Sequence, residues 1–285
     1  MAPGVVSLEI EAPRIAKAAL PGQFVIVRAD ERGERIPLTL SDWDAGKGTV
    51  RLVIQTVGYS TGKICSLKAG DSLADVAGPL GRPSELTELP AERLRGTSIL
   101  FVAGGVGAAP VYAQVKWLRG QGTPADVIVG AKSAGNLILT EELKAQAAGL
   151  YIATDDGSAG YKGLVTELMK DLVERQGRRY DLVVAIGPMI MMKFAALAAA
   201  GLGIRSVVSL NTLMVDGTGM CGACRVTVGG RTKFACVDGP EFDGAEVDFD
   251  EAMRRQGMYR DMEKLAAEGH RCRIGLGRGR TERND

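Results

Sequence analysis

Three cysteines near the end of the chain have a spacing suited to holding iron or zinc. Cys221 and Cys224 are two residues apart, which places two thiolates on one tight turn, and Cys236 follows after eleven intervening residues. The stretch between them predicts a hairpin of two strands around Gly229-Gly230, which would bring Cys236 back beside the first pair. The chain has five cysteines, and this odd number favours metal or redox chemistry over a disulfide framework.

A 2Fe–2S cluster needs a fourth ligand, which these three cysteines do not supply. Plant-type ferredoxins place a cysteine five residues before the C-x2-C pair, and that spacing falls here on Asp216. We therefore predict Asp216 as the fourth ligand and a reduction potential that differs from that of an all-cysteine site. Zinc and plain structural thiols are the alternatives for the cysteines. Cys65, Cys272 or a partner's residue could supply the fourth bond instead of Asp216.

The elements that must position these residues show two different rhythms. Up to about residue 95, short β-branched and apolar runs separated by turns predict a small antiparallel β-barrel. From residue 96, strands alternate with helices, which predicts a parallel sheet in an α/β domain. We expect a barrel over 1–95, an α/β domain over 96–210, a small cysteine segment over 211–250, a C-terminal helix over 251–268 and a disordered tail over 269–285.

A glycine-rich turn follows the first predicted strand of the α/β domain. Gly104, Gly105 and Gly107 would let a phosphate-bearing ligand approach backbone amides at a helix N-terminus, and Pro110 suits the first helical turn. The motif lacks the full G-x-G-x-x-G pattern, so the glycines could instead only permit tight packing between strand and helix.

Two later strand ends fall at the same edge of the predicted sheet, where ligands of open α/β sheets bind. Gly187 and Pro188 end one strand, while Asp155 and Asp156 end another. Carboxylates in that place would bind ribose hydroxyls and repel a 2′-phosphate, which favours NAD over NADP. The alternative is that these aspartates cap a turn.

Two motifs of the barrel could hold a flavin. The segment 57–62, VGYSTG, offers amides and hydroxyls at the start of a short helix, suitable for a pyrophosphate. Thr39 could donate a hydrogen bond to a flavin ring nitrogen, and it is the candidate catalytic residue. The predicted flavin contacts are Arg35, Ile36, Pro37, Leu38, Thr39, Val53, Ile54, Gln55, Gly58, Ser60 and Thr61.

The order of barrel, nucleotide domain and cysteine segment resembles the ferredoxin–NADP reductase superfamily. The segments RIPLT, TDDGS, GPMIMMKF, MVDGTGMCGACRVTVGG and KFACVDGPEFDG carry the resemblance. They resemble the electron-transfer subunit of class B dihydroorotate dehydrogenase. They resemble more closely the small subunits of NADH-dependent ferredoxin:NADP oxidoreductases, also called sulfide dehydrogenase small subunits, and Asp216 points to this branch. The R-x-x-S flavin motif of relatives falls on residues 36–39, so its arginine is missing and Arg35 lies one position early.

The resemblance implies FAD in the barrel, NAD(H) on the α/β domain and a 2Fe–2S cluster in the cysteine segment. It implies an oxidoreductase subunit that exchanges hydride with NAD(H) at FAD and passes single electrons to a partner, in an electron-bifurcating enzyme. The partner would be a large iron–sulfur flavoprotein subunit, similar to the small subunit of glutamate synthase, in a heterodimer. Electron input to an NAD-dependent dihydroorotate dehydrogenase is the alternative, and a zinc-stabilised binding module without activity is a third possibility.

Composition excludes several other classes of protein. The net charge of +1 creates no field that would attract nucleic acid or an anionic membrane. No apolar stretch is long enough to span a membrane, and the first residues do not have the pattern of a signal peptide. We therefore expect a cytoplasmic protein with neither nucleic acid nor membrane as partner. The single histidine, His270, argues against a histidine base or a multi-histidine metal site.

Overall fold

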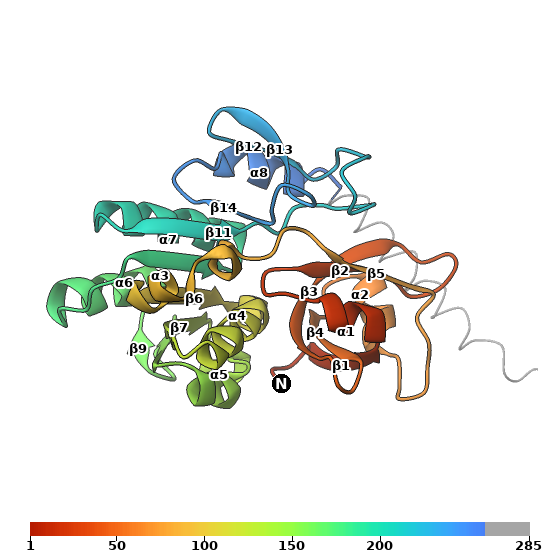
Figure 1. Cartoon of the computed structure of the whole chain (residues 1–285), viewed down its shortest axis with the longest axis horizontal. Coiled ribbons are helices and arrows are strands. Elements are labelled where there is room, and N and C mark those ends of the chain that lie inside the picture. The colour runs from red at the N-terminus through yellow and green to blue at the C-terminus, as the bar shows by residue number, and fades with distance from the viewer. Residues whose placement is uncertain (260–285) are drawn as a thin grey trace, which may run out of the picture.

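The apolar runs form two separate sheets and a hairpin in the computed structural model, which describes residues 1–259 (Figure 1). The predictions for the end of the C-terminal helix, the tail, Cys272 and His270 lie outside the described residues. No helix in the described part is long and apolar enough to cross a membrane.

The first sheet is the predicted antiparallel barrel, at the right of Figure 1. Its strands follow the order β1-β4-β3-β2-β5, and every neighbouring pair is antiparallel. Alternate residues of β2, Val25 and Val27, point into the barrel core, while Phe24 and Ile26 point outward into a different core. The elements are β1 (Val5–Glu11), α1 (Pro13–Ala18), β2 (Phe24–Arg28), β3 (Arg35–Asp44), β4 (Thr49–Gln55), α2 (Tyr59–Cys65) and β5 (Asp75–Leu80).

The second sheet has seven strands in the order β14-β11-β10-β6-β7-β8-β9. The strands from β11 to β9 are parallel, and β14 closes one edge in the antiparallel sense. The strands are β6 (Ile99–Gly104), β7 (Asp126–Ala131), β8 (Gly149–Thr154), β9 (Tyr161–Lys162), β10 (Leu182–Ile186), β11 (Arg205–Ser209) and β14 (Glu241–Asp243).

Helices cover both faces of this sheet, because its central strands are apolar on both sides. In β6, Leu100 and Val102 face one core, while Phe101 and Ala103 face the other. The helices are η1 (Glu85–Glu88), α3 (Ala91–Gly96), η2 (Gly105–Gly107), α4 (Ala108–Gly120), η3 (Ala134–Asn136), α5 (Thr140–Gln146), α6 (Val165–Lys170), η4 (Asp171–Arg175), α7 (Met189–Gly201) and α8 (Phe249–Gln256).

The cysteine segment forms the predicted hairpin, with strands β12 (Arg225–Val228) and β13 (Arg231–Phe234). Gly229 and Gly230 both have positive φ angles, of 57° and 71°, as a tight hairpin turn requires. The hairpin and α8 lie together beyond the edge of the seven-stranded sheet (Figure 1).

The predicted fold class is confirmed, since an antiparallel barrel, a parallel α/β sheet and a small hairpin segment are all present. The sequence did not indicate the short strands β9 and β14, which have only two and three residues. The exact domain boundaries remain a prediction: the barrel's last strand ends at Leu80 and the next sheet begins at Ile99.

Candidate cofactor cleft and cysteine segment

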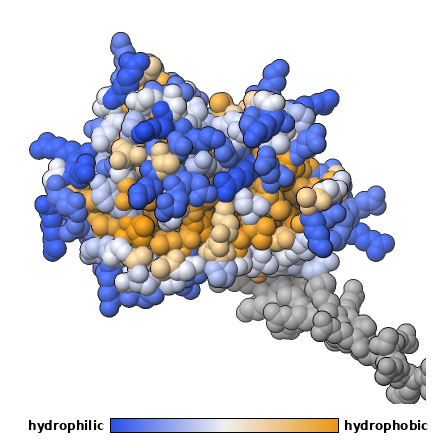
Figure 2. All heavy atoms as spheres, turned by 90° about the horizontal axis from the view of Figure 1, so that it is seen from below, coloured by the Kyte–Doolittle hydropathy of each residue, from blue (hydrophilic) through white to orange (hydrophobic). Residues whose placement is uncertain are grey.

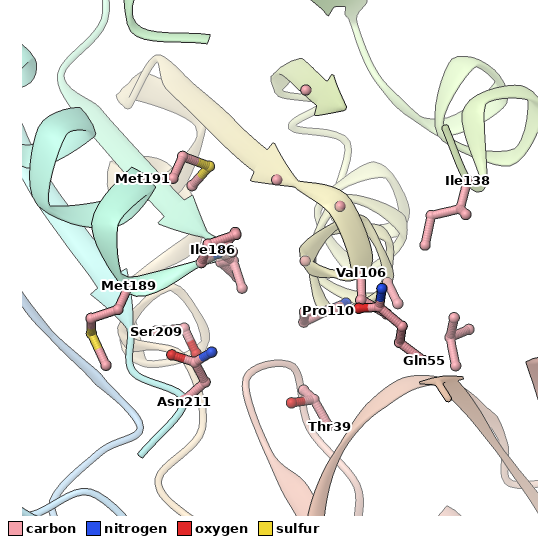
Figure 3. Close-up of a pocket in the computed structure, with 18 of the residues that line it drawn as sticks. Thr39, Gln55, Val106, Pro110, Ile138, Ile186, Met189, Met191, Ser209 and Asn211 are labelled. Atoms are coloured by element: carbon pink, nitrogen blue, oxygen red, sulfur yellow. The ribbon is translucent and has the colours of Figure 1, made fainter. Parts of the chain in front are cut away.

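A cleft of about 1380 Å³ lies between the barrel and the carboxyl edge of the seven-stranded sheet. This is where the rule for open α/β sheets places a ligand. Figure 3 shows Thr39 and Gln55 facing it from the barrel, and Ile186 and Met191 facing it from the sheet side. The predicted site residues that line the cleft are Pro37, Leu38, Thr39, Val53, Ile54, Gln55, Thr61, Gly104, Gly105, Gly107, Pro110, Asp155, Gly187 and Pro188.

Five predicted cofactor contacts do not line the cleft, namely Arg35, Ile36, Gly58, Ser60 and Asp156. Ser60 donates a hydrogen bond of 2.5 Å to Glu34. Arg35 is exposed, and its Nε donates to the carbonyl of Val215 at 3.3 Å, in the cysteine segment. The role of these five residues as cofactor contacts remains a prediction.

The glycines at the strand ends pack the two neighbouring turns against each other. A Cβ atom on Gly107 would lie 2.1 Å from the carbonyl oxygen of Ile186, and one on Gly187 would lie 3.0 Å from the backbone of Gly104. Gly107 and Gly187 are therefore needed for close backbone packing, which is the alternative role given above for the glycines of the first turn. Gly105 differs, because its φ is +54° and a Cβ there would meet nothing within 4 Å. Its peptide is open to the cleft, as a backbone cradle for a phosphate requires.

The two aspartates of the TDDGS segment have different surroundings. Asp156 accepts hydrogen bonds from the backbone and the hydroxyl of Ser158, at 2.9 and 2.6 Å, and these bonds lower the pKa of Asp156. Asp156 therefore caps the turn, which is the alternative role given above for these two aspartates. Asp155 lines the cleft and remains the candidate for a ribose contact.

Hydrogen bonds to a threonine hydroxyl cap the N-terminus of α2, the short helix of the barrel. Thr61 accepts hydrogen bonds from the backbone N–H groups of Val57 and Gly58, at 3.1 and 3.0 Å, and this caps α2. The hydroxyl of Thr61 thus orders the turn, while its exposed side lines the cleft.

Several polar residues that line the cleft have no counterpart among the predicted site residues. Ser209 ends β11, Asn211 and Thr212 follow it, and Lys132 and Asn136 follow β7. All of them lie at or past the carboxyl ends of parallel strands, so the rule that selected Asp155 could have found them. Thr212 has a buried hydroxyl without a hydrogen-bond partner among the described residues, which leaves a polar group available to a ligand.

Apolar side chains form much of the cleft surface and of the surface beside it. Figure 2 shows a band of hydrophobic residues crossing the molecule between polar margins. Among the lining residues, Val57, Leu164 and Ile190 are exposed by 75%, 56% and 49%. Large exposed apolar side chains of this kind mark ligand-binding or interaction sites. The volume, the apolar walls and the open peptide of Gly105 fit a flavin and a nicotinamide nucleotide.

The cysteine segment brings two of the predicted ligands together. Cys224 and Cys236 are buried, with their sulfur atoms 3.2 Å apart, whereas Cys221 is exposed. Burial, and next the neighbouring Cys224, raise the pKa of Cys236 to about 12. Within residues 1–259, no three Cys, His, Asp or Glu side chains are arranged to hold a metal ion together. The soft sulfur pair suits iron–sulfur or zinc chemistry, and a bound metal would provide the positive charge that two thiolates need.

Asp216 organises the loop that carries Cys221. Its carboxylate accepts the backbone N–H of Thr218 at 2.7 Å and that of Cys221 at 2.9 Å. The bond from Thr218 is the largest cause that lowers the pKa of Asp216. Asp216 is therefore ionised and adjacent to the cysteine turn, and its role as the fourth ligand remains a prediction.

The cysteine segment packs on the barrel as well as on its own hairpin. Gly217 has a φ of +78°, and a Cβ there would lie 2.8 Å from Leu80 and 2.9 Å from Ile26. The outward side chains Phe24 and Ile26 of β2 belong to the same apolar core as both buried cysteines. The predicted cluster site therefore contacts a strand of the barrel directly.

A buried carboxylate lies where the barrel, the α/β domain and the cysteine segment meet. Glu241 of β14 accepts a hydrogen bond of 2.6 Å from Gln114 of α4. Its Oε2 is shielded from solvent and has no partner in the described structure, and neither has the hydroxyl of Ser84. A Cβ on Gly22 would lie 3.1 Å from the Glu241 carboxylate. Burial raises the pKa of Glu241 to about 7.

Comparison with known proteins agrees with this arrangement. The model of the iron–sulfur cluster binding domain of dihydroorotate dehydrogenase B matches residues 211–248. A protein from Thermotoga maritima, described as a homologue of the dihydroorotate dehydrogenase B (NAD(+)) electron transfer subunit, is 47% identical over 91% of this chain and 88% of its own. The chain belongs to this family of electron-transfer subunits. The family predicted from the sequence is thereby confirmed.

Two further relatives of this electron-transfer family are informative. An uncharacterised protein encoded in the adh 3′ region of Clostridium beijerinckii is 56% identical, over 92% of this chain and 88% of that protein. A solved NADH-dependent reduced ferredoxin–NADP oxidoreductase, studied for flavin-based electron bifurcation, is 45% identical with a TM-score of 0.84 and covers 94% of both chains. The cytochrome P450 reductase GcoB of Amycolatopsis shares only the fold, with 18% identity and a TM-score of 0.57 over 70% of this chain and 62% of GcoB.

The family membership confirms two broader predictions. The chain is a flavin-dependent oxidoreductase of the ferredoxin-reductase type. As an electron-transfer subunit, it works beside a catalytic partner subunit.

Proposed function

We propose that this chain takes electrons from NADH at FAD and passes them singly through a 2Fe–2S cluster to a larger partner subunit, in an electron-bifurcating oxidoreductase. Electron flow in the reverse direction uses the same groups. The single observation that carries the proposal is the position of the cysteine segment. It packs on the outward face of β2, and Phe24 of that face also lines the cleft, beside residues of β3 and β4. A barrel that touches both sites can connect two-electron and one-electron chemistry.

The predicted cofactors have separate places in this arrangement. FAD would occupy the barrel side of the cleft, with Thr39 and Gln55 beside its ring, and NAD(H) the sheet side, with Asp155 near a ribose. When bound, these cofactors supply the hydride and single-electron chemistry, and the protein supplies orientation and electrostatics. Gly105 offers its peptide to a phosphate, and the apolar walls exclude water from the region between the two nucleotides.

The cysteine segment supplies thiolates from Cys221, Cys224 and Cys236, with Asp216 as the proposed fourth ligand. Cys221 is exposed, so its side chain can turn toward the buried pair when metal binds. Asp216 would then exchange its hydrogen bonds to backbone amides for a bond to iron. Those amides would become donors to the cluster sulfur atoms, which helps to set the reduction potential.

The proposed partner is a large iron–sulfur flavoprotein subunit similar to the small subunit of glutamate synthase, in a heterodimer. The solved relative studied for electron bifurcation supports this choice, because it shares 45% identity over nearly the whole chain. The alternative is electron input to an NAD-dependent dihydroorotate dehydrogenase, which the names of several relatives favour. We also propose a cytoplasmic location for the complex.

Absorption spectroscopy of the purified chain tests the proposal. We expect a spectrum of flavin plus ferredoxin-like cluster that is bleached by NADH, together with iron and sulfide in the protein. Bleaching by NADPH and not by NADH would refute the nucleotide assignment. Stoichiometric zinc in place of iron would refute the electron relay and support a structural metal site. Identification of the co-purifying subunit decides between the two partner enzymes.

A further inference from the structure

Two arginines from distant parts of the chain hold the cysteine segment by its backbone. Arg35, the first residue of β3, donates from Nε to the carbonyl oxygen of Val215 at 3.3 Å. Arg255, near the end of α8, donates from Nη2 to the carbonyl oxygen of Ala223 at 3.2 Å. Val215 directly precedes Asp216 and Ala223 directly precedes Cys224. Each arginine therefore holds the peptide that leads into a predicted cluster ligand.

The guanidinium of Arg255 has unused hydrogen-bonding capacity. Its Nε is shielded from solvent and has no hydrogen-bond partner within residues 1–259. A buried N–H group of a cation is costly when it is unpaired, and it is satisfied best by a negatively charged acceptor. A cluster held by three thiolates and a carboxylate is such a group, because its net charge is negative and its sulfur atoms accept hydrogen bonds.

Arg35 holds the other end of the segment on the barrel. Gly217, two residues after Val215, packs against Ile26 and Leu80 so closely that even a Cβ atom on it would be too near to them. On the same strand as Arg35, Thr39 lines the cofactor cleft. β3 therefore contacts both the proposed flavin site and the segment that carries the proposed cluster.

We propose that Arg35 and Arg255 are positioning residues that clamp the cysteine segment between the barrel and α8 and raise the electron affinity of the cluster. The proposal rests on the proposed function, since it assumes a cluster in this segment. The clamp fixes the ligand-bearing backbone, and the positive charge of each guanidinium stabilises the reduced cluster, which is more negative by one charge than the oxidised one. An arginine suits this role because its planar fork binds in a fixed direction and its charge does not titrate.

The first test is an EPR-monitored redox titration of the full chain loaded with FAD and cluster. Arg255→Met should lower the equilibrium constant for cluster reduction about tenfold, which is about 59 mV for a one-electron couple. Arg35→Met should lower it less, because Arg35 is exposed and solvent screens its charge. Arg255→Lys should recover part of the loss, since it restores the charge without the fork. The matched controls are Arg254→Met and Arg32→Met. Both arginines are exposed; Arg254 is next to Arg255, and Arg32 lies three residues before Arg35.

Hydrogen exchange at the amides of residues 212–224 is a second test, which does not require a cluster. Exchange should accelerate in Arg35→Met and Arg255→Met and stay unchanged in the two controls. If the wild-type protein holds no iron, the proposed function fails, while the exchange rates still decide whether the arginines hold the segment. Potentials and exchange rates equal to those of the controls would overturn the clamp. Loss of FAD from Arg35→Met, with exchange unchanged, would make Arg35 a flavin contact and remove the barrel half of the clamp.

Discussion

Replacing Glu241 by glutamine should make the protein more stable at alkaline pH. The carboxylate lies at the junction of three parts of the fold, where burial raises its pKa from the ordinary 4.5 to about 7. Nearby, Gln114 and Ser84 provide neutral polar groups, and the charge of Glu85 opposes ionisation of Glu241. Glu85 is itself paired with Arg205. No cation therefore appears among the groups that shift this carboxyl group.

The sign of the effect follows from the two protonation states. Below pH 4.5, Glu241 is protonated in the folded and the unfolded chain, and no penalty arises. As the pH rises toward 7, the unfolded chain releases the proton while the folded chain retains it, so stability falls. At about 1.4 kcal/mol per pH unit, the full penalty at pH 8 is about 3 kcal/mol. Glutamine keeps the shape and cannot ionise, so the variant should lose none of this stability.

Scanning calorimetry of the full chain between pH 5 and pH 8.5 measures the difference. Relative to Glu241→Gln, the wild-type melting temperature should fall by about 5–10 °C across this range, at about 2–4 °C per kcal/mol. Glu88→Gln is the control, because Glu88 is an exposed carboxylate in η1 on the neighbouring linker. If wild type and Glu241→Gln show parallel pH profiles, Glu241 ionises normally and the argument from burial is wrong.

Three further changes test the site. Asp216→Cys should keep a cluster with a shifted EPR spectrum and potential, whereas unchanged iron content and spectrum in Asp216→Ala would place the fourth ligand elsewhere. Asp155→Asn should raise the KM for NADH about tenfold, as expected for the loss of a charged hydrogen bond to a ribose; Asp156→Asn should change KM much less, because the Asp156 carboxylate is hydrogen-bonded to Ser158. Gly107→Ala should destabilise the fold by about 3 kcal/mol or more in chemical denaturation, because its Cβ would overlap the carbonyl of Ile186. Gly58→Ala, where a Cβ meets nothing within 4 Å, serves as the tolerated comparison.

The sequence predicted correctly those elements that are determined by residues close together in the chain. The Gly229-Gly230 turn specified its hairpin, and the alternation of strands with helices specified the parallel sheet, since both depend on neighbours in sequence. The cleft residues Asp155 and Gly187 of the α/β domain were also found, because the carboxyl ends of parallel strands define where they lie.

What the sequence could not show depends on contacts between distant segments. Nothing around Arg35 indicates that its side chain reaches Val215, 180 positions later. Glu241 belongs to a short strand with no visible signal, and its burial arises only when Gln114 and Gly22 surround it. Likewise, composition could not separate Asp155 from Asp156, because their different roles depend on a hydrogen bond to Ser158 that only the folded turn defines.

The contact between the two glycine turns affects any attempt to redesign nucleotide preference. Gly107 and Gly187 leave no room even for a methyl group, so the backbone of the turn after β6 cannot move without displacing the turn after β10. Substitutions in either turn would disturb both halves of the nucleotide site at once. The turns after β7 and β8 are joined by backbone hydrogen bonds, but the side chains of Lys132 and Asp155 are exposed at the same cleft. To exchange one dinucleotide for another, substitutions should therefore be made at Lys132 and Asp155. The packed turns that contain Gly107 and Gly187 should be left unchanged.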